Sequence, residues 1–166
     1  MIFGVEMEQN KIYIDYLKNF GYMQDINRDD RVKKTQEVFT PINACIDLIE
    51  YTMKFTDNML YDTVFDNCVG DGEWLGAVLI KRLEAGIDLK TAVSTLRGCD
   101  LLTDNVERCH KRLSCGDESL YPILEKNIIV SNSLQYHYRW DNSPPYDDEA
   151  KEQQFEERWD NLFKDG

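Results

Sequence analysis

The chain lacks the features that mark secreted and membrane-spanning proteins. Its 166 residues contain no apolar run long enough to cross a bilayer. Residues 1–6 include an early acid and no basic region, which does not fit a signal peptide. Five cysteines are present, an odd number without a C-x-x-C pair, so a disulfide framework is not indicated. We therefore expect a reduced cytoplasmic protein that makes no contact with a membrane.

Metal-ligand spacing is lacking as well. The nearest candidates are Cys99, Cys109, His110 and Cys115, whose spacing fits no common zinc site. Cys109 and His110 are adjacent and fall on a predicted helix, where their side chains diverge. The sequence therefore predicts no metal site.

Positive charge is scarce. The chain has 19 basic and 31 acidic residues, a net charge of −12, which is unfavourable for holding DNA by its phosphates. The pairs Lys33-Lys34, Lys81-Arg82 and Lys111-Arg112 are scattered, and we interpret them as solvated helix surfaces rather than a phosphate track. Residues 141–166 contain nine acids and three bases, and their charge of −6 is half of the total. This tail is either a solvated extension or a mimic of DNA that competes for a basic groove.

What is present indicates one folded domain, since 42% of the residues are hydrophobic. We divide the chain into an N-terminal helical segment (1–36), a core (37–140) and the acidic tail (141–166). Strands are predicted at 63–66, 97–102 and 127–130. Helices are predicted between them, at 74–84, at 88–96 and from Thr103 or Asp104 onward, with a loop at 114–120. This alternation predicts an α/β fold with a parallel sheet and flanking helices.

Two further patterns bear on the edges of that sheet. Thr40 and Pro41 are predicted as N-cap and first residue of a helix with an apolar stripe. Tyr136, Tyr138 and Trp140 alternate with polar residues, too soon after the third strand for a crossover connection. The first strand is then a sheet edge, and we expect the aromatic segment, a second copy or a partner chain to cover it.

The most informative segment runs from Thr63 to Leu75. A short β-branched run ends at Asp66, a turn with Gly70 and Gly72 follows, and an apolar helix begins at Trp74. A strand, glycine turn and helix in this order let backbone approach a bound nucleotide. A side chain at either glycine would block the turn or collide with such a ligand.

Residues 31–134 resemble the S-adenosylmethionine (SAM)-dependent amino-methyltransferases of DNA. The resemblance rests on Val38-Phe39-Thr40-Pro41, on Asp66–Leu75, which matches the pattern D-P-x-C-G-x-G-x-[FW]-L with Asn67 in the proline place, and on Gly98-Cys99-Asp100. It is strongest for the adenine-N6 class and its small methyltransferase-like relatives in tailed phages. It implies a truncated Rossmann-like fold, SAM as cofactor, DNA as partner, and a bacterial or phage-infected host cell.

The resemblance also implies a cofactor site. The methionine end of SAM would be contacted by Thr40, Pro41, Asp66, Gly70 and Gly72. Asp100 would accept hydrogen bonds from the ribose hydroxyls, as acids do in dinucleotide folds, and Leu101 would flank the adenine. Asn132 would contact the adenine edge. Each also has a purely structural interpretation: Thr40 as a helix cap, Asp100 as an exposed strand-end acid, Asn132 as a strand-end cap.

Catalysis in this family needs a [DNS]-P-P-[YFW] element, which holds the target amino group and stacks on the flipped base. Ser143, Pro144, Pro145 and Tyr146 match its letters, although an acidic run follows and a proline-rich linker is the alternative. We therefore expect a SAM-binding, methyltransferase-like protein whose independent catalysis is in doubt. The alternatives are an active minimal enzyme, completed by a partner or dimer mate, and a non-enzymatic acidic interaction or anti-restriction protein.

Overall fold

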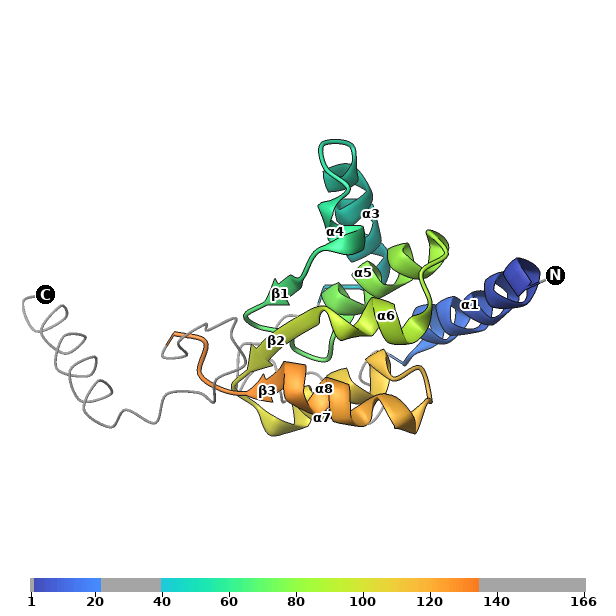
Figure 1. Ribbon diagram of the computed structural model, residues 1–166. Coiled ribbons are helices and arrows are strands. Elements are labelled where there is room, and N and C mark those ends of the chain that lie inside the picture. The colour runs from blue at the N-terminus through green and yellow to red at the C-terminus, as the bar shows by residue number, and fades with distance from the viewer. Residues whose placement is uncertain (1, 22–39, 135–166) are drawn as a thin grey trace, which may run out of the picture.

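A three-stranded parallel sheet lies at the centre of the computed structural model, which describes residues 2–21 and 40–134. The strands are β1 (Val64–Asp66), β2 (Leu96–Asp100) and β3 (Ile128–Val130), in the spatial order β1-β2-β3 (Figure 1). Val64 pairs with Leu96, and Gly98 pairs with Ile128. The predicted α/β architecture with a parallel sheet and flanking helices is thus confirmed, and within the described residues β1 is an edge strand.

Helix α5 (Glu73–Glu84) follows β1 and is the most enclosed helix of the described chain. It contacts α1 (Ile2–Asn19), α3 (Ile42–Met53), α7 (Thr103–Leu113) and β1. Nine of its twelve residues are buried, because neighbouring elements cover the helix on several sides. The α5 helix therefore fixes the end of the glycine turn from which it starts.

The C-terminal end of α5 is tied down by side chains of α1 and of α5 itself. Asn10 of α1 is buried, and its amide donates to the carbonyls of Leu83 and Ile87. Arg82 is buried as well, and its guanidinium donates to four acceptors around the amino ends of β1 and β2. These are the carbonyls of Met59, Asp62 and Ala92 and the hydroxyl of Thr95. The interpretation of Arg82 as a solvated residue was wrong.

Short helices complete the connections. Helix α4 (Asn58–Tyr61) precedes β1, and α6 (Leu89–Ser94) lies between α5 and β2. Asp88 caps α6, its carboxylate accepting from the Thr91 amide. The 3-10 helix η1 (Glu118–Leu120) and α8 (Tyr121–Asn127) lead into β3. The sequence predicted a loop at 114–120 and missed α8, whose seven residues are too few to show a helical period.

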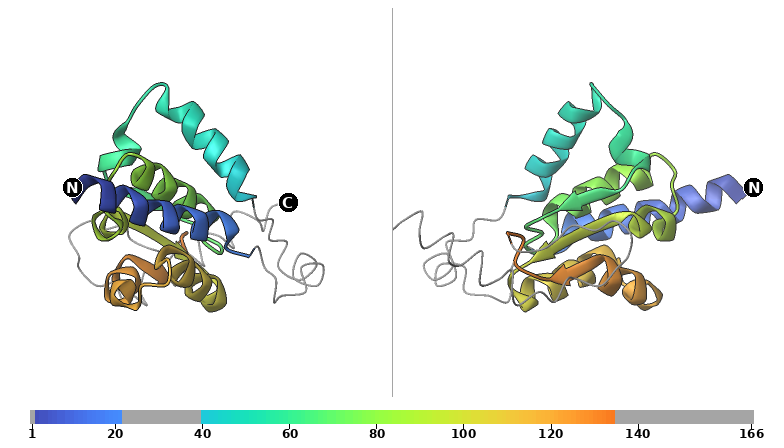
Figure 2. Two further views of the ribbon diagram at one scale, coloured as in Figure 1. Left: turned by 90° about the vertical axis from the view of Figure 1, so that its right-hand side faces the viewer. Right: turned by 60° about the vertical axis from the view of Figure 1, so that its left-hand side comes forward.

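Figures 1 and 2 show α3 and α4 beyond the β1 edge of the sheet, and α7 and α8 near β3. The predicted apolar stripe of α3 packs inward through Cys45 and Ile49, which are buried. Its predicted start was wrong by one residue. Pro41, with ψ 143°, occupies the N-cap position, and no side chain among the described residues caps the helix. Thr40 therefore lies outside the helix and is exposed.

The second strand and the next helix also differ from prediction at their junction. Strand β2 ends at Asp100, so Leu101 and Leu102 lie outside the sheet. Leu102, rather than Thr103 or Asp104, occupies the N-cap position of α7. The reason is that Asp100 bends back to accept a hydrogen bond from the Leu102 amide, which ends the strand early. This turn places Asp100 at the carboxyl edge of the sheet.

Candidate functional site

The loop between β1 and α5 lies against the carboxyl end of β2. The Val69 amide donates to the Cys99 carbonyl at 3.0 Å. A Cβ on Gly98 would lie 2.2 Å from Val69 Cγ1 and 2.6 Å from the Asp66 carbonyl oxygen, so only glycine fits there. The loop and the end of β2 thus form one continuous surface at the carboxyl edge, where open α/β sheets bind ligands.

The two glycines of the loop adopt the left-handed conformation expected of them. Their φ angles are 53° at Gly70 and 87° at Gly72. A Cβ on Gly72 would also lie 2.8 Å from Cys109 Sγ on α7. The turn and its packing on α7 are therefore sufficient reasons for Gly72, independently of any ligand.

Asp100 connects the loop, the end of β2 and α7. Its Oδ2 accepts from the Gly70 amide at 2.9 Å, and its Oδ1 accepts from the Leu102 amide and the Asn105 side chain, both at 3.0 Å. The interpretation as an exposed strand-end acid was wrong, because Asp100 is buried. Asn105, also buried, was not singled out from the sequence. Its position one helical turn before Cys109, on the inner face of α7, is the sequence feature that could have indicated its burial.

Asp66 shapes the first half of the loop. Its Oδ1 accepts from the Cys68 amide at 3.0 Å. Burial raises the pKa of the Asp66 carboxyl, and the nearby charge of Asp100 raises it further, while the Cys68 amide opposes both. Asp66 and Asp100 therefore place two carboxyl groups close together at the carboxyl edge of the sheet.

The remaining predicted cofactor contacts lie around this edge. Leu101 is 68% exposed and directly follows Asp100. Beyond β3, the Asn132 side chain accepts from the Leu134 amide at 3.1 Å, the local turn expected of a strand-end asparagine. The Thr40 carbonyl accepts a weak hydrogen bond from Cys45 Sγ at 3.8 Å. Burial, with the negative charge of Glu73, raises the pKa of the Cys45 thiol to about 11, so Cys45 is neutral.

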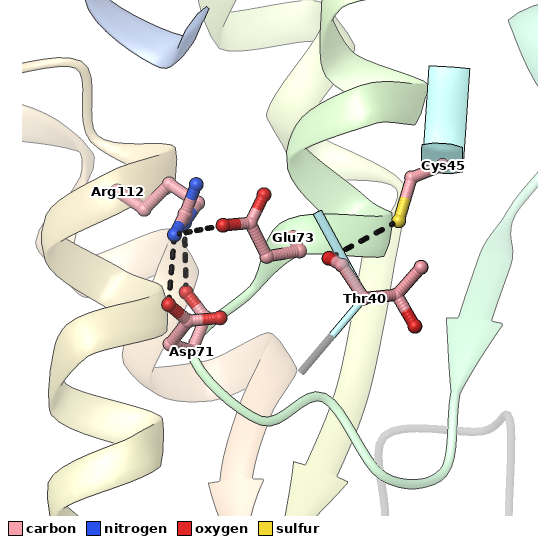
Figure 3. Close-up of polar contacts among 5 residues, drawn as sticks. All are labelled: Thr40, Cys45, Asp71, Glu73 and Arg112. Carbon is pink, nitrogen blue, oxygen red and sulfur yellow. Dashed lines mark hydrogen bonds and ion pairs between the residues drawn. The ribbon is translucent and has the colours of Figure 1, made fainter. Parts of the chain in front are cut away.

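A buried ionic cluster behind the loop was missed by the sequence analysis. Arg112 of α7 donates from Nε to the Asp71 carbonyl at 2.8 Å, and from Nη2 to Asp71 Oδ2 at 2.8 Å and Glu73 Oε1 at 2.9 Å. Figure 3 shows Glu73 between this guanidinium and the Thr40–Cys45 pair. The guanidinium also lies 4.6 Å from the ring centre of Phe20. The interpretation of Arg112 as a solvated residue was therefore wrong.

The cluster is incompletely paired. Within the part of the chain that the structure describes, Asp71 Oδ1, Glu73 Oε2 and Arg112 Nη1 are buried and have no hydrogen-bond partner. Burial is the main cause that raises the pKa of the Glu73 carboxyl to about 7, and Asp71 adds to the effect while Arg112 opposes it. Two carboxylates sharing one guanidinium leave a net negative charge inside the protein, which is costly without a further partner.

The structure thus brings Asp66, Gly70, Gly72 and Asp100 together, with Leu101 beside them. The candidate catalytic residues Ser143, Pro144, Pro145 and Tyr146 lie outside the described residues. Within residues 2–21 and 40–134, no group of three metal-ligating side chains occurs. The same stretches contain no helix that is long and apolar enough to span a membrane.

No protein-family model, curated protein or solved structure matched this chain. The site combines backbone amides at the start of α5, a buried acid that ends β2, and an exposed apolar side chain. Such a set suits a nucleoside joined to a polar group.

Proposed function

We propose that this protein binds SAM at the carboxyl ends of β1 and β2, in a Rossmann-like site related to that of DNA adenine-N6 methyltransferases. One observation supports this above all. The Gly70 amide and the Asp100 carboxylate, thirty residues apart, meet at 2.9 Å where neighbouring parallel strands end. A glycine turn beside a strand-end acid is the arrangement that receives a nucleoside.

In this proposal the start of α5 and the loop approach the methionine end of SAM. Gly72 occupies the N-cap position of α5 without a side-chain cap, so the first turn of the helix presents its dipole toward a ligand carboxylate. Thr40 and Pro41 border the same region, and Asn132 lies beyond β3. Asp100 would exchange part of its internal hydrogen bonding for the ribose hydroxyls, and Leu101 would cover the adenine.

Calorimetric titration with SAM tests this proposal. We expect a Kd in the micromolar range, on the order of 8 kcal/mol of binding free energy. Asp100→Asn should weaken binding by roughly 10- to 100-fold, because it places an amide where Gly70 and the ribose need an acceptor. Glu125→Gln, on the exposed surface of α8, is the matched control and should bind like the wild type. A flat titration of the wild type at millimolar SAM would refute the proposal.

Methyl transfer is a separate question from binding. The reaction needs no nucleophile and depends on holding the target amino group in line with the sulfonium methyl. We propose that the isolated chain methylates DNA poorly, because Ser143–Tyr146 adjoin an acidic run that repels phosphates. A tritiated-SAM assay on mixed genomic DNA measures this. Robust incorporation that disappears in Tyr146→Ala would instead establish an active minimal enzyme.

A further inference from the structure

Negative charge at the glycine loop exceeds what the contacting guanidinium neutralises. Asp71 lies between the two loop glycines, and Glu73 is the first residue of α5. Both carboxylates form ion pairs with Arg112, at 2.8 and 2.9 Å. With all three groups ionised, the cluster has a net charge of −1, and Asp66 and Asp100 lie in the same loop region.

The cluster also has unused hydrogen-bonding capacity. The side chains of Asp71 and Glu73 are 1% and 8% exposed, yet Asp71 Oδ1 and Glu73 Oε2 have no hydrogen-bond partner among the described residues. A buried carboxylate oxygen without a donor is poorly solvated, so its charge acts on nearby groups with little screening. Burial is the main cause that raises the pKa of Glu73 to about 7, and the charge of Asp71 adds to it while Arg112 opposes it.

We infer that Asp71 and Glu73 make this a site for a ligand with a net positive charge, so that the protein prefers SAM to its demethylated product, S-adenosylhomocysteine. This inference rests on the proposed function. The two ligands share the amino-acid part, whose charges cancel, and the adenosine. They differ in the sulfonium, which gives SAM a net charge of +1 and leaves the product neutral.

The expected preference follows from Coulomb's law in a partly buried site. At separations of several ångströms and an intermediate effective dielectric constant, one unit of charge changes affinity by roughly tenfold or more. Asp71 and Glu73 belong to the segment placed against the methionine end, so their charge acts at this range. A site with this bias would retain the substrate and release the product.

Calorimetry at pH 8, where Glu73 is ionised, measures the inference with two ligands. We expect the wild type to bind SAM at least about tenfold more tightly than S-adenosylhomocysteine. Binding of neither ligand would refute the proposed function together with this inference. Equal binding, or tighter binding of the product, would leave the proposed function standing and overturn the inference.

Two isosteric variants test the assigned residues. Glu73→Gln and Asp71→Asn each remove one charge, and each should reduce the SAM-to-product affinity ratio by roughly threefold to tenfold. Glu84→Gln removes the same charge at the far end of α5 and should leave the ratio unchanged. A purely structural cluster would weaken both ligands equally, so an unchanged ratio in both variants overturns the inference. Thermal unfolding shows whether each variant is folded. If one variant does not fold, the other still tests the inference.

Discussion

The two buried arginines, Arg82 and Arg112, lie at opposite ends of the same structural unit and are paired in different ways. Arg82 lies where β1 and β2 begin, and each of its three nitrogens donates to a neutral acceptor. Arg112 lies behind the loop that follows β1. It pairs with Asp71 and Glu73, while its Nη1 has no hydrogen-bond partner in residues 2–21 and 40–134.

Arg82 therefore has a structural role, whereas Arg112 belongs to a charged cluster. Arg82 donates hydrogen bonds to carbonyl groups at chain turns that would otherwise lack a donor. Each of its own nitrogens already donates, so a ligand would not improve its pairing. Arg112 holds two carboxylates, each with one oxygen that accepts no hydrogen bond from the residues described by the structure. The polar groups around Arg82 at the amino end of the sheet are thus paired. The cluster around Arg112 at the carboxyl end has an excess of carboxylates, as a ligand-binding edge would have.

The largest effect is expected from Arg112→Met. At pH 8 it should lower the free energy of unfolding by about 3 to 5 kcal/mol, because two buried carboxylates lose their cation. The loss should shrink at pH 5, where the carboxylates can take up protons. Urea denaturation at pH 8 and at pH 5 measures this loss of stability. Arg82→Met is the comparison, since its acceptors are neutral and its loss should be the same at both values.

A smaller effect is expected from Gly72→Ala. The left-handed φ of 87° and the 2.8 Å approach to Cys109 Sγ should together cost about 2 to 4 kcal/mol. Gly86 has nearly the same φ, 85°, and a Cβ added there would have nothing within 4 Å, so Gly86→Ala isolates the backbone term of about 1 kcal/mol. Equal losses in urea denaturation would show that the contact with α7 is relieved without cost.

The smallest effect is expected from Glu73→Gln, and it concerns the pH dependence of stability. The pKa of Glu73 is raised from 4.5 to about 7, so the folded state holds a proton that the unfolded state releases between these values. The stability that Glu73 contributes is therefore present below pH 4.5 and is lost as pH rises to about 7. The variant should lack this loss, which is on the order of 1 to 3 kcal/mol. Parallel stability curves between pH 5 and 8 would contradict the assignment.

The sequence predicted most of the elements that form the site, because local patterns determine them. The β-branched run before Asp66 and the paired glycines are adjacent in the chain, and the structure has them as expected. Helix α5 follows them directly and begins at Glu73, one residue before the predicted Trp74. Helix α8 could not be predicted in this way, because it is short, contains Pro122 and grows out of η1. Its position depends on packing against α6, α7 and β3.

The ionic cluster could not be predicted, because its members are far apart in the sequence. Arginine is rarely buried, so Arg112 was interpreted as part of a solvated pair. A signal was nevertheless present: Asn105, Cys109 and Arg112 follow a helical period on one face of α7. The partner that makes burial of Arg112 tolerable, Asp71, is supplied by a turn forty-one positions away, and only the folded chain reveals that pairing.

The close approach of Gly72 to Cys109 has a consequence for recognising distant relatives. Because Cys109 Sγ occupies the space where a side chain on residue 72 would begin, the two positions share one fixed volume. Enlarging either one requires the loop to take another path. A glycine at the first position together with a small residue at the second is therefore a two-letter signature of this loop, and it can be searched for in sequences whose structures are not known.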